Sequence, residues 1–133
     1  MSETRLSGHC YCGAVKFEVK GGSDWVGHCH CESCRRASGS VMTTFAGFSE
    51  NQVVFTGATP NRFSSGDGVT RSFCGQCGSP VAYQGASQPG QIHLHLGLFD
   101  DIEALPASDH SFLNEKISWL KADEHLPGSD WQN

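Results

Sequence analysis

The chain has 133 residues, of which 38% are hydrophobic and 17% charged, and its formal net charge is −5. This balance excludes a disordered chain, the 16 glycines argue against a helix bundle, and the length suits one mostly β domain over residues 1–133. No run of lysines or arginines is present to hold a nucleic-acid backbone, so we expect no nucleic-acid partner.

The longest apolar stretches, residues 41–48 and 94–99, are far shorter than the roughly 20 residues that a membrane-spanning helix needs. We therefore expect no membrane partner. The N-terminal residues lead into a polar segment with glycine and cysteine rather than into the apolar core of a signal peptide. We expect a cytoplasmic protein, in a reducing compartment where thiols stay free or bind metal.

The first predicted strand covers residues 15–20, where Val15, Phe17 and Val19 alternate with charged side chains. Apolar runs between Gly, Asn, Ser and Pro residues predict four further strands, at 41–48, 52–56, 70–73 and 80–84. Residues 91–99 alternate again. This alternation places Ile92, Leu94, Leu96 and Leu98 on one face of a strand and His93, His95 and Phe99 on the other.

Helical segments are expected to be few and short. Residues 32–37 suit one helical turn, and residues 100–105 suit a turn that ends at Pro106. Residues 114–122 fit both a helical and a strand spacing, and we favour a strand. Together with about six strands, these short segments predict a mostly β fold rather than an α/β fold.

The seven cysteines form the most specific pattern in the sequence. In chain order they read C-x-C at Cys10 and Cys12, C-x-C-x-x-C at Cys29, Cys31 and Cys34, and C-x-x-C at Cys74 and Cys77. Two intervening residues allow a tight turn to direct both sulfurs at one metal ion, and an extended C-x-C segment presents both side chains on one face. The spacing therefore predicts zinc coordination.

A structural zinc takes four protein ligands, so seven thiolates divide most simply into four and three. The set of four would be Cys10, Cys12, Cys74 and Cys77, and the set of three Cys29, Cys31 and Cys34. Three protein ligands with one open position are typical of catalytic zinc, where water or substrate takes the fourth place. We therefore expect one closed and one open zinc site.

Other assignments of the cysteines stay open at this point. One alternative groups Cys10 and Cys12 with Cys31 and Cys34. Another completes the second site with His28, His30 or His9 and makes both zincs structural, although a histidine beside metal-binding cysteines in an extended segment points to the opposite face. Disulfides and a redox C-x-x-C are disfavoured, because the cysteine count is odd and no βαβ pattern surrounds either motif.

Three segments, residues 8–15, 29–39 and 73–78, resemble the glutathione-dependent formaldehyde-activating enzyme family. The tail, with Trp119 and the pair Leu126-Pro127, looks like the closing segment of that family. The resemblance thus covers nearly the whole chain, with three cysteine motifs in the family's order and spacing.

This resemblance implies a single-domain β-tent fold built around a structural zinc. By the same resemblance, Cys10, Cys12, Cys74 and Cys77 would hold that zinc, and Cys29, Cys31 and Cys34 would hold the catalytic one. The family's activity joins glutathione and formaldehyde into S-hydroxymethylglutathione and is classed as a carbon–sulfur lyase. The implied partners are therefore two small molecules, glutathione as cosubstrate and an aldehyde.

Two functional classes follow from these observations. The first is an enzyme that forms or breaks thiol–aldehyde adducts on the open zinc. The second is a non-catalytic zinc module with two structural sites that binds a protein partner. Because the chain carries no basic or low-complexity extension, we favour the enzyme.

Arg35 and Arg36 directly follow the last cysteine of the middle motif, so either guanidinium could bind a glutathione carboxylate in a bidentate pair. A solvated basic pair is the alternative. Glu32, within the same motif, is expected at the surface.

Aromatic and imidazole side chains are further candidates. Trp25, Phe48 and Phe99 could wall a pocket, although aromatic residues in a small β domain more often belong to the core. His93 and His95 share one predicted strand face, where they could act as acid and base or pack at a sheet edge.

Overall fold

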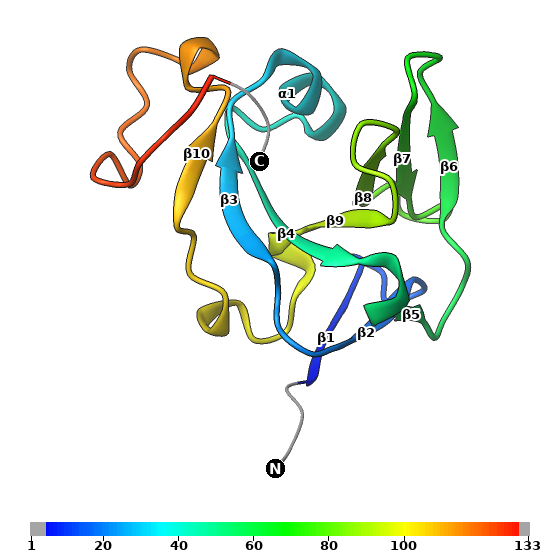
Figure 1. The fold of residues 1–133 in the computed structure, drawn as a ribbon. Helices are drawn as coiled ribbons and strands as arrows, with labels where there is room; N and C mark the ends of the chain where they lie inside the picture. Colours follow the sequence, from blue (N-terminus) through cyan, green and yellow to red (C-terminus); the bar gives the residue numbers. More distant parts are fainter. Residues whose placement is uncertain (1–4, 131–133) are drawn as a thin grey trace.

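Ten strands form two sheets in the computed structural model, which describes residues 5–130 (Figure 1). The smaller sheet is antiparallel, in the order β1-β2-β5, with strands Arg5–His9, Lys16–Lys20 and Val53–Phe55. The larger has seven strands in the order β10-β3-β4-β9-β8-β7-β6. Their bounds are β3 Trp25–Cys29, β4 Thr43–Ser49, β6 Asn61–Ser64, β7 Val69–Phe73, β8 Pro80–Gly85, β9 Gln91–His95 and β10 Asp109–Ser111. Neighbours are antiparallel except β10, which runs parallel to β3.

One α-helix, α1 (Glu32–Ser38), and four 3-10 turns complete the described elements. The turns are η1 (Glu50–Gln52), η2 (Leu96–Leu98), η3 (Ile102–Ala104) and η4 (Leu113–Glu115). Within residues 5–130, no helix combines the length and the apolar character that a bilayer crossing requires. The mostly β fold that the sequence predicts is confirmed.

The main core lies between the two sheets. Strands β1 and β2 alternate between exposed and buried residues, which puts Phe17 and Val19 against the larger sheet. Phe99 connects the layers, since its ring centroid lies 5.1 Å from that of Phe17 and 6.0 Å from that of Phe48 in β4. Burial of such rings supplies much of the favourable free energy of folding.

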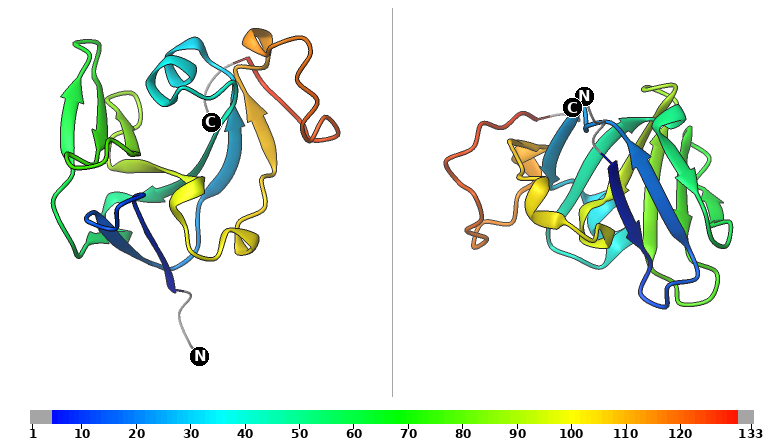
Figure 2. Two further views of the ribbon diagram at one scale, coloured as in Figure 1. Left: turned by 180° about the vertical axis from the view of Figure 1, so that it is seen from behind. Right: turned by 90° about the horizontal axis from the view of Figure 1, so that it is seen from below.

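The opposite face of the larger sheet carries a second, smaller buried cluster. Its members are Cys29, Cys34, Phe45 and Tyr83. Because strand residues alternate between faces, Phe45 joins this cluster while Ala46 and Phe48 of β4 face the main core. Helix α1 lies above strands β4 and β9 and the small sheet lies below them, as Figure 1 and the left view of Figure 2 show.

Two sequence predictions about elements are wrong. Strand β9 ends at His95, and the 3-10 turn η2 rotates the following chain, so Phe99 joins Leu94 in the core instead of facing away from it. Residues 114–122 form no strand. They continue from η4 into a turn in which the Leu120 amide donates to the Ile117 carbonyl. No strand of the described chain pairs with this segment, and Trp119 is exposed.

Candidate metal centres and cavity

Four cysteines from two hairpin turns meet at one point. The turn between β1 and β2 supplies Cys10 and Cys12, and the turn between β7 and β8 supplies Cys74 and Cys77. All four Sγ atoms lie within 4.8 Å of one another, with 3.7 Å from Cys10 to Cys12 and 3.8 Å from Cys12 to Cys74. A tetrahedron with Zn–S bonds of about 2.3 Å has edges of about 3.8 Å. The four-cysteine cluster therefore fits a zinc ion.

Backbone amides in both turns point at these sulfurs. The Val15 amide donates to Cys10 Sγ at 3.3 Å, and the Cys77 amide donates to Cys74 Sγ at 3.4 Å. Burial opposes ionisation of Cys10, but this amide and the neighbouring thiols together lower the pKa of Cys10. The Ser79 hydroxyl and amide lower the pKa of Cys77 to about 5. The turns thus favour the thiolate form of Cys10 and Cys77, whereas at Cys12 a backbone hydrogen bond is outweighed by burial and the neighbouring thiols, which raise its pKa to about 11.

The three remaining cysteines gather where β3 meets α1. Cys29 ends β3, Cys31 is the N-cap of α1, and Cys34 lies in the first turn of the helix. Cys31 Sγ lies 3.5 Å from Cys29 Sγ and accepts a hydrogen bond of 3.3 Å from the Cys34 amide. Helix α1 then ends at Gly39, which has the left-handed φ of 75° that favours glycine. This short helix holds the three-cysteine cluster in place.

The three-cysteine cluster has no fourth protein ligand among residues 5–130, where no further Cys, His, Asp or Glu side chain joins the group. Hydrogen bonds from Cys29 and Cys34 lower the pKa of Cys31. The neighbouring thiols in turn raise the pKa of Cys34 and of Cys29. Three thiolates this close repel one another unless a cation lies among them, which is the chemistry of a thiolate metal site.

The histidines beside this cluster turn away from it. His28 hydrogen-bonds to Thr44 Oγ1 at 2.7 Å and to Asp123 Oδ2 at 2.8 Å. His30 Nε2 hydrogen-bonds to His110 Nδ1 at 2.8 Å. The opposite-face argument from the sequence therefore holds for both, and neither completes the three-cysteine cluster.

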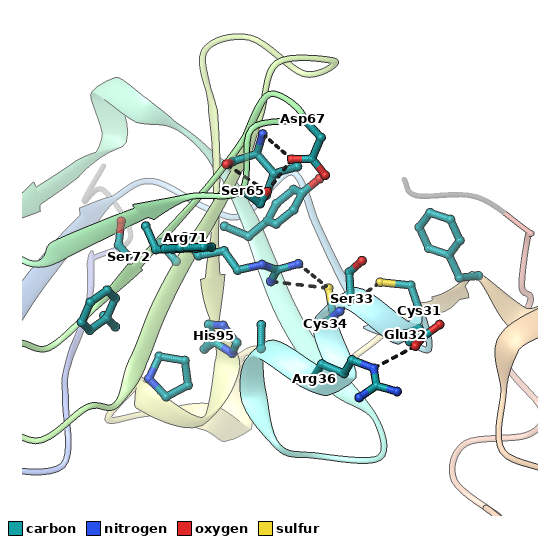
Figure 3. A pocket seen from close by; sticks show the side chains of 18 of the residues that line it. Cys31, Glu32, Ser33, Cys34, Arg36, Ser65, Asp67, Arg71, Ser72 and His95 are labelled. Atoms are coloured by element: carbon teal, nitrogen blue, oxygen red, sulfur yellow. Dashed lines mark hydrogen bonds and ion pairs between the residues drawn. The ribbon is translucent and has the colours of Figure 1, made fainter.

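A cavity of about 760 Å³ opens onto the three-cysteine cluster, and Cys31 and Cys34 form part of its wall (Figure 3). Its other walls come from α1, the β6–β7 hairpin, β8 and the segment after β10. Cavities of roughly 300–1,000 Å³ are typical of small-molecule sites. The cavity beside the three-cysteine cluster is therefore large enough for a tripeptide and a second reactant.

Arg71 of β7 reaches across this cavity to the cluster (Figure 3). Its two terminal nitrogens lie 3.7 Å and 3.9 Å from Cys34 Sγ. Its guanidinium carbon lies 5.0 Å from the centre of the Tyr83 ring, a cation–π contact that orients the side chain. Arg71 thus places a positive charge between the cavity and a candidate metal ligand.

A row of three rings in contact supports Arg71 from behind. Tyr83 lies beside His93, with ring centroids 5.3 Å apart, and His93 meets Trp25 at 4.6 Å. Trp25 reaches this position because residue 47 is glycine, where a Cβ would lie 2.3 Å from the indole. Together with Arg71, these rings extend across the larger sheet from β3 to β7.

The structure separates the two arginines that the sequence proposes for binding. Arg36 lines the cavity, and its Nε donates to Glu32 Oε2 at 2.8 Å in an exposed ion pair. Arg35 is not among the residues that line the cavity. Sequence reasoning did not identify Arg71 as a site residue. Its place in a predicted strand, three residues before Cys74, could have indicated a position near the cysteine motifs.

The aromatic walls also differ from those that the sequence suggested. Trp25, Phe48 and Phe99 do not line the cavity, and the latter two are core residues. Four other aromatic residues line it: Phe63, Phe73, Tyr83 and Phe112. Of the two candidate histidines, His95 lines the cavity, and burial lowers its pKa to about 4.

Two known proteins resemble this chain, one in sequence and one in fold. A curated protein of Halomonas elongata, named "Putative glutathione-dependent formaldehyde-activating enzyme", is 27% identical over 125 residues, which cover 87% of this chain and 80% of that protein. A crystal structure of a Rhodobacter sphaeroides protein shares the fold, with a TM-score of 0.60 and 18% identity over 92% of this chain and 99% of that one.

A family model matches most of the chain. The model of the glutathione-dependent formaldehyde-activating enzyme family matches residues 5–115, a span that contains all seven cysteines and most of the cavity wall. The resemblance drawn from the cysteine motifs is thereby confirmed. The chain belongs to the glutathione-dependent formaldehyde-activating enzyme family.

Proposed function

We propose that this protein is a zinc-dependent carbon–sulfur lyase that forms and breaks thiol–aldehyde adducts, with S-hydroxymethylglutathione as the reference product. One observation carries the proposal. The three-cysteine cluster has no fourth protein ligand within residues 5–130, and two of its cysteines line a cavity of about 760 Å³. A purely structural site is typically closed by four protein ligands and faces no cavity.

The reaction requires one new bond and one proton transfer. The thiol sulfur adds to the aldehyde carbon, the C=O double bond becomes a single bond, and the thiol proton passes to the aldehyde oxygen. The reverse reaction returns the proton to sulfur as the carbon–sulfur bond breaks. A zinc ion held by the three thiolates would use its open position either to lower the pKa of the incoming thiol or to polarise the aldehyde oxygen.

The chain's own residues position the reactants. Glutathione carries two carboxylates, and the cavity presents two guanidinium groups, those of Arg71 and Arg36. Arg71 is oriented by Tyr83 and lies beside Cys34, so a carboxylate bound there keeps the thiol close to the cluster. Arg36 is held by Glu32 at the cavity edge, which suits the second carboxylate.

The four-cysteine cluster has a different role in this proposal. It joins the β1–β2 turn of the small sheet to the β7–β8 turn of the large one. We assign it a structural zinc that fixes the two sheets to each other.

The test combines metal analysis with an exchange assay. We expect two zinc ions per chain by atomic emission, and faster exchange between glutathione, formaldehyde and their adduct by NMR than in buffer alone. Cys34→Ser should reduce exchange to the buffer rate while its near-ultraviolet circular dichroism stays unchanged. Lys121→Ala, an exposed residue outside the cavity, serves as the control. Full activity in Cys34→Ser, or two zincs with no exchange at all, would instead favour a non-catalytic zinc module.

A further inference from the structure

The cavity has an apolar part that neither formaldehyde nor glutathione explains. Formaldehyde has one carbon, and the groups that glutathione offers besides its thiol are charged or amide. Yet the wall carries large apolar side chains from separate elements, including Phe63 and Phe112. A site built only for these two polar reactants does not need such a wall, because apolar surface binds apolar groups.

Phe63 lies beside Arg71 in the cavity wall, and its ring is largely uncovered by protein. It is the cross-strand partner of Arg71, so the two side chains share one face of the β6–β7 hairpin. Its exposed fraction is 61%, among the largest for an apolar side chain in the described residues. A phenyl ring beside a substrate-binding arginine gains free energy when an apolar ligand group covers it.

Phe112 comes from a different element, the segment that follows β10. It lines the same cavity and packs against the buried cluster that contains Cys29 and Cys34. Its backbone has φ 54° and ψ 46°, the left-handed conformation that residues other than glycine, asparagine and aspartate rarely adopt. Such conformations cluster at functional sites. Here the conformation accompanies an aromatic ring placed next to the three-cysteine cluster.

We propose that the aldehyde used by this protein carries an apolar group of about aromatic size, which the exposed Phe63 ring covers in the cavity. This inference rests on the proposed function and names its substrate class. The thiol sulfur adds to the carbonyl carbon as before, and the aldehyde substituent stays on that carbon throughout. A carboxylate of the adduct lies at Arg71, and the apolar substituent lies against the neighbouring Phe63 ring.

The test uses binding as well as turnover, because stable thioethers mimic the adduct without reacting. S-benzylglutathione carries a phenyl group on the carbon that an aromatic aldehyde contributes, and S-methylglutathione carries none. By calorimetry we expect the zinc-loaded protein to bind the benzyl compound at least about tenfold more tightly. Exchange assays with glutathione should likewise favour benzaldehyde over formaldehyde in kcat/KM.

Phe63→Ala should lower the affinity ratio of the two thioethers by about tenfold. Val54→Ser is the matched control, because Val54 is 59% exposed but lies outside the cavity, and it should leave the ratio unchanged. Equal affinity of the wild-type protein for both thioethers, or an unchanged ratio in Phe63→Ala, overturns the proposal even if formaldehyde turns over. A benzyl preference that Phe63→Ala removes supports the apolar site even if no aldehyde is turned over, in which case only the proposed activity fails.

Discussion

Arg71 links the three-cysteine cluster to the larger sheet through two contacts of different kinds. Its terminal nitrogens reach Cys34 Sγ, and its guanidinium plane covers the Tyr83 ring. The stacking contact restricts the side chain, so less rotamer entropy is lost when an anion binds. Arg71 therefore combines charge with a fixed orientation, which a lysine at the same position would not provide.

We predict that Arg71→Ala raises the KM for glutathione by about tenfold or more, because one charge-assisted carboxylate contact is lost. Arg71→Lys should give an intermediate KM, since it keeps the charge but not the bidentate geometry. NMR exchange rates measured over a range of glutathione concentrations provide the KM. Arg62→Ala is the matched control, because Arg62 lies on the neighbouring strand and does not line the cavity. An unchanged KM in Arg71→Ala would remove this residue from glutathione binding.

The sequence predicts the cysteines well and Arg71 poorly, for a physical reason. Metal-binding turns are local, so spacings such as that from Cys31 to Cys34 carry the signal by themselves. The contact between Arg71 and Cys34 joins residues 37 positions apart, and it exists only because β7 lies next to β8 beside α1. Residues that act through sheet neighbours leave little trace in short sequence motifs.

At the scale of elements, the packing between strands β3 and β4 depends on a close contact between the Trp25 indole and the backbone of Gly47. Gly47 in β4 leaves the space in which the Trp25 indole lies, and this contact supports the ring row behind Arg71. A side chain at residue 47 would displace a rigid ring rather than the flexible end of a chain. The position is therefore sensitive even though it contributes no polar group to the site.

We predict that Gly47→Ala destabilises the protein by about 1–3 kcal/mol, as expected for overpacking in a filled interior. Urea unfolding followed by tryptophan fluorescence measures this change. In the control variant Gly97→Ala the new methyl group meets no atom within 4 Å, so its unfolding midpoint should stay close to that of the wild type. Equal midpoints for Gly47→Ala and the wild type would show that Trp25 can move aside without cost.

Six of the seven strands favoured by the sequence are present, the one at residues 114–122 is not, and four others were missed. Strand β6 is exposed along its whole length, and β3 is buried along most of its length, so neither shows the alternation that identifies a half-buried strand. Strand β10 has three residues and exists as a parallel partner of β3. Strand β1 contains Gly8, a residue that weakens a strand signal. Pairing partners, rather than local patterns, define these four elements.

At the scale of the whole molecule, the four-cysteine cluster lies where a turn of each sheet meets, so a zinc ion bound there would connect the two sheets. Its ligands come in pairs from turns at the ends of two hairpins. The three-cysteine cluster, in contrast, lies within one junction between β3 and α1. Loss of metal from the two clusters should therefore have different consequences for the fold.

We predict that Cys77→Ser lowers the zinc content from about two ions to about one and lowers the Tm by about 10 °C or more. Cys31→Ser should also remove one zinc but change the Tm less, because serine is itself a good N-cap for α1. Atomic emission and thermal circular dichroism measure both quantities. If the two variants melt together, the four-cysteine cluster does not hold the sheets to each other.

The different spans of the two clusters also set an order of metal loading during synthesis. Cys29, Cys31 and Cys34 leave the ribosome almost together, whereas Cys12 must wait for Cys74, which follows 62 residues later. Local ligands close their loop quickly and with little loss of entropy, so we expect the nascent chain to load the three-cysteine cluster first. A cell short of zinc would then produce chains that hold this ion before the four-cysteine cluster joins the two sheets.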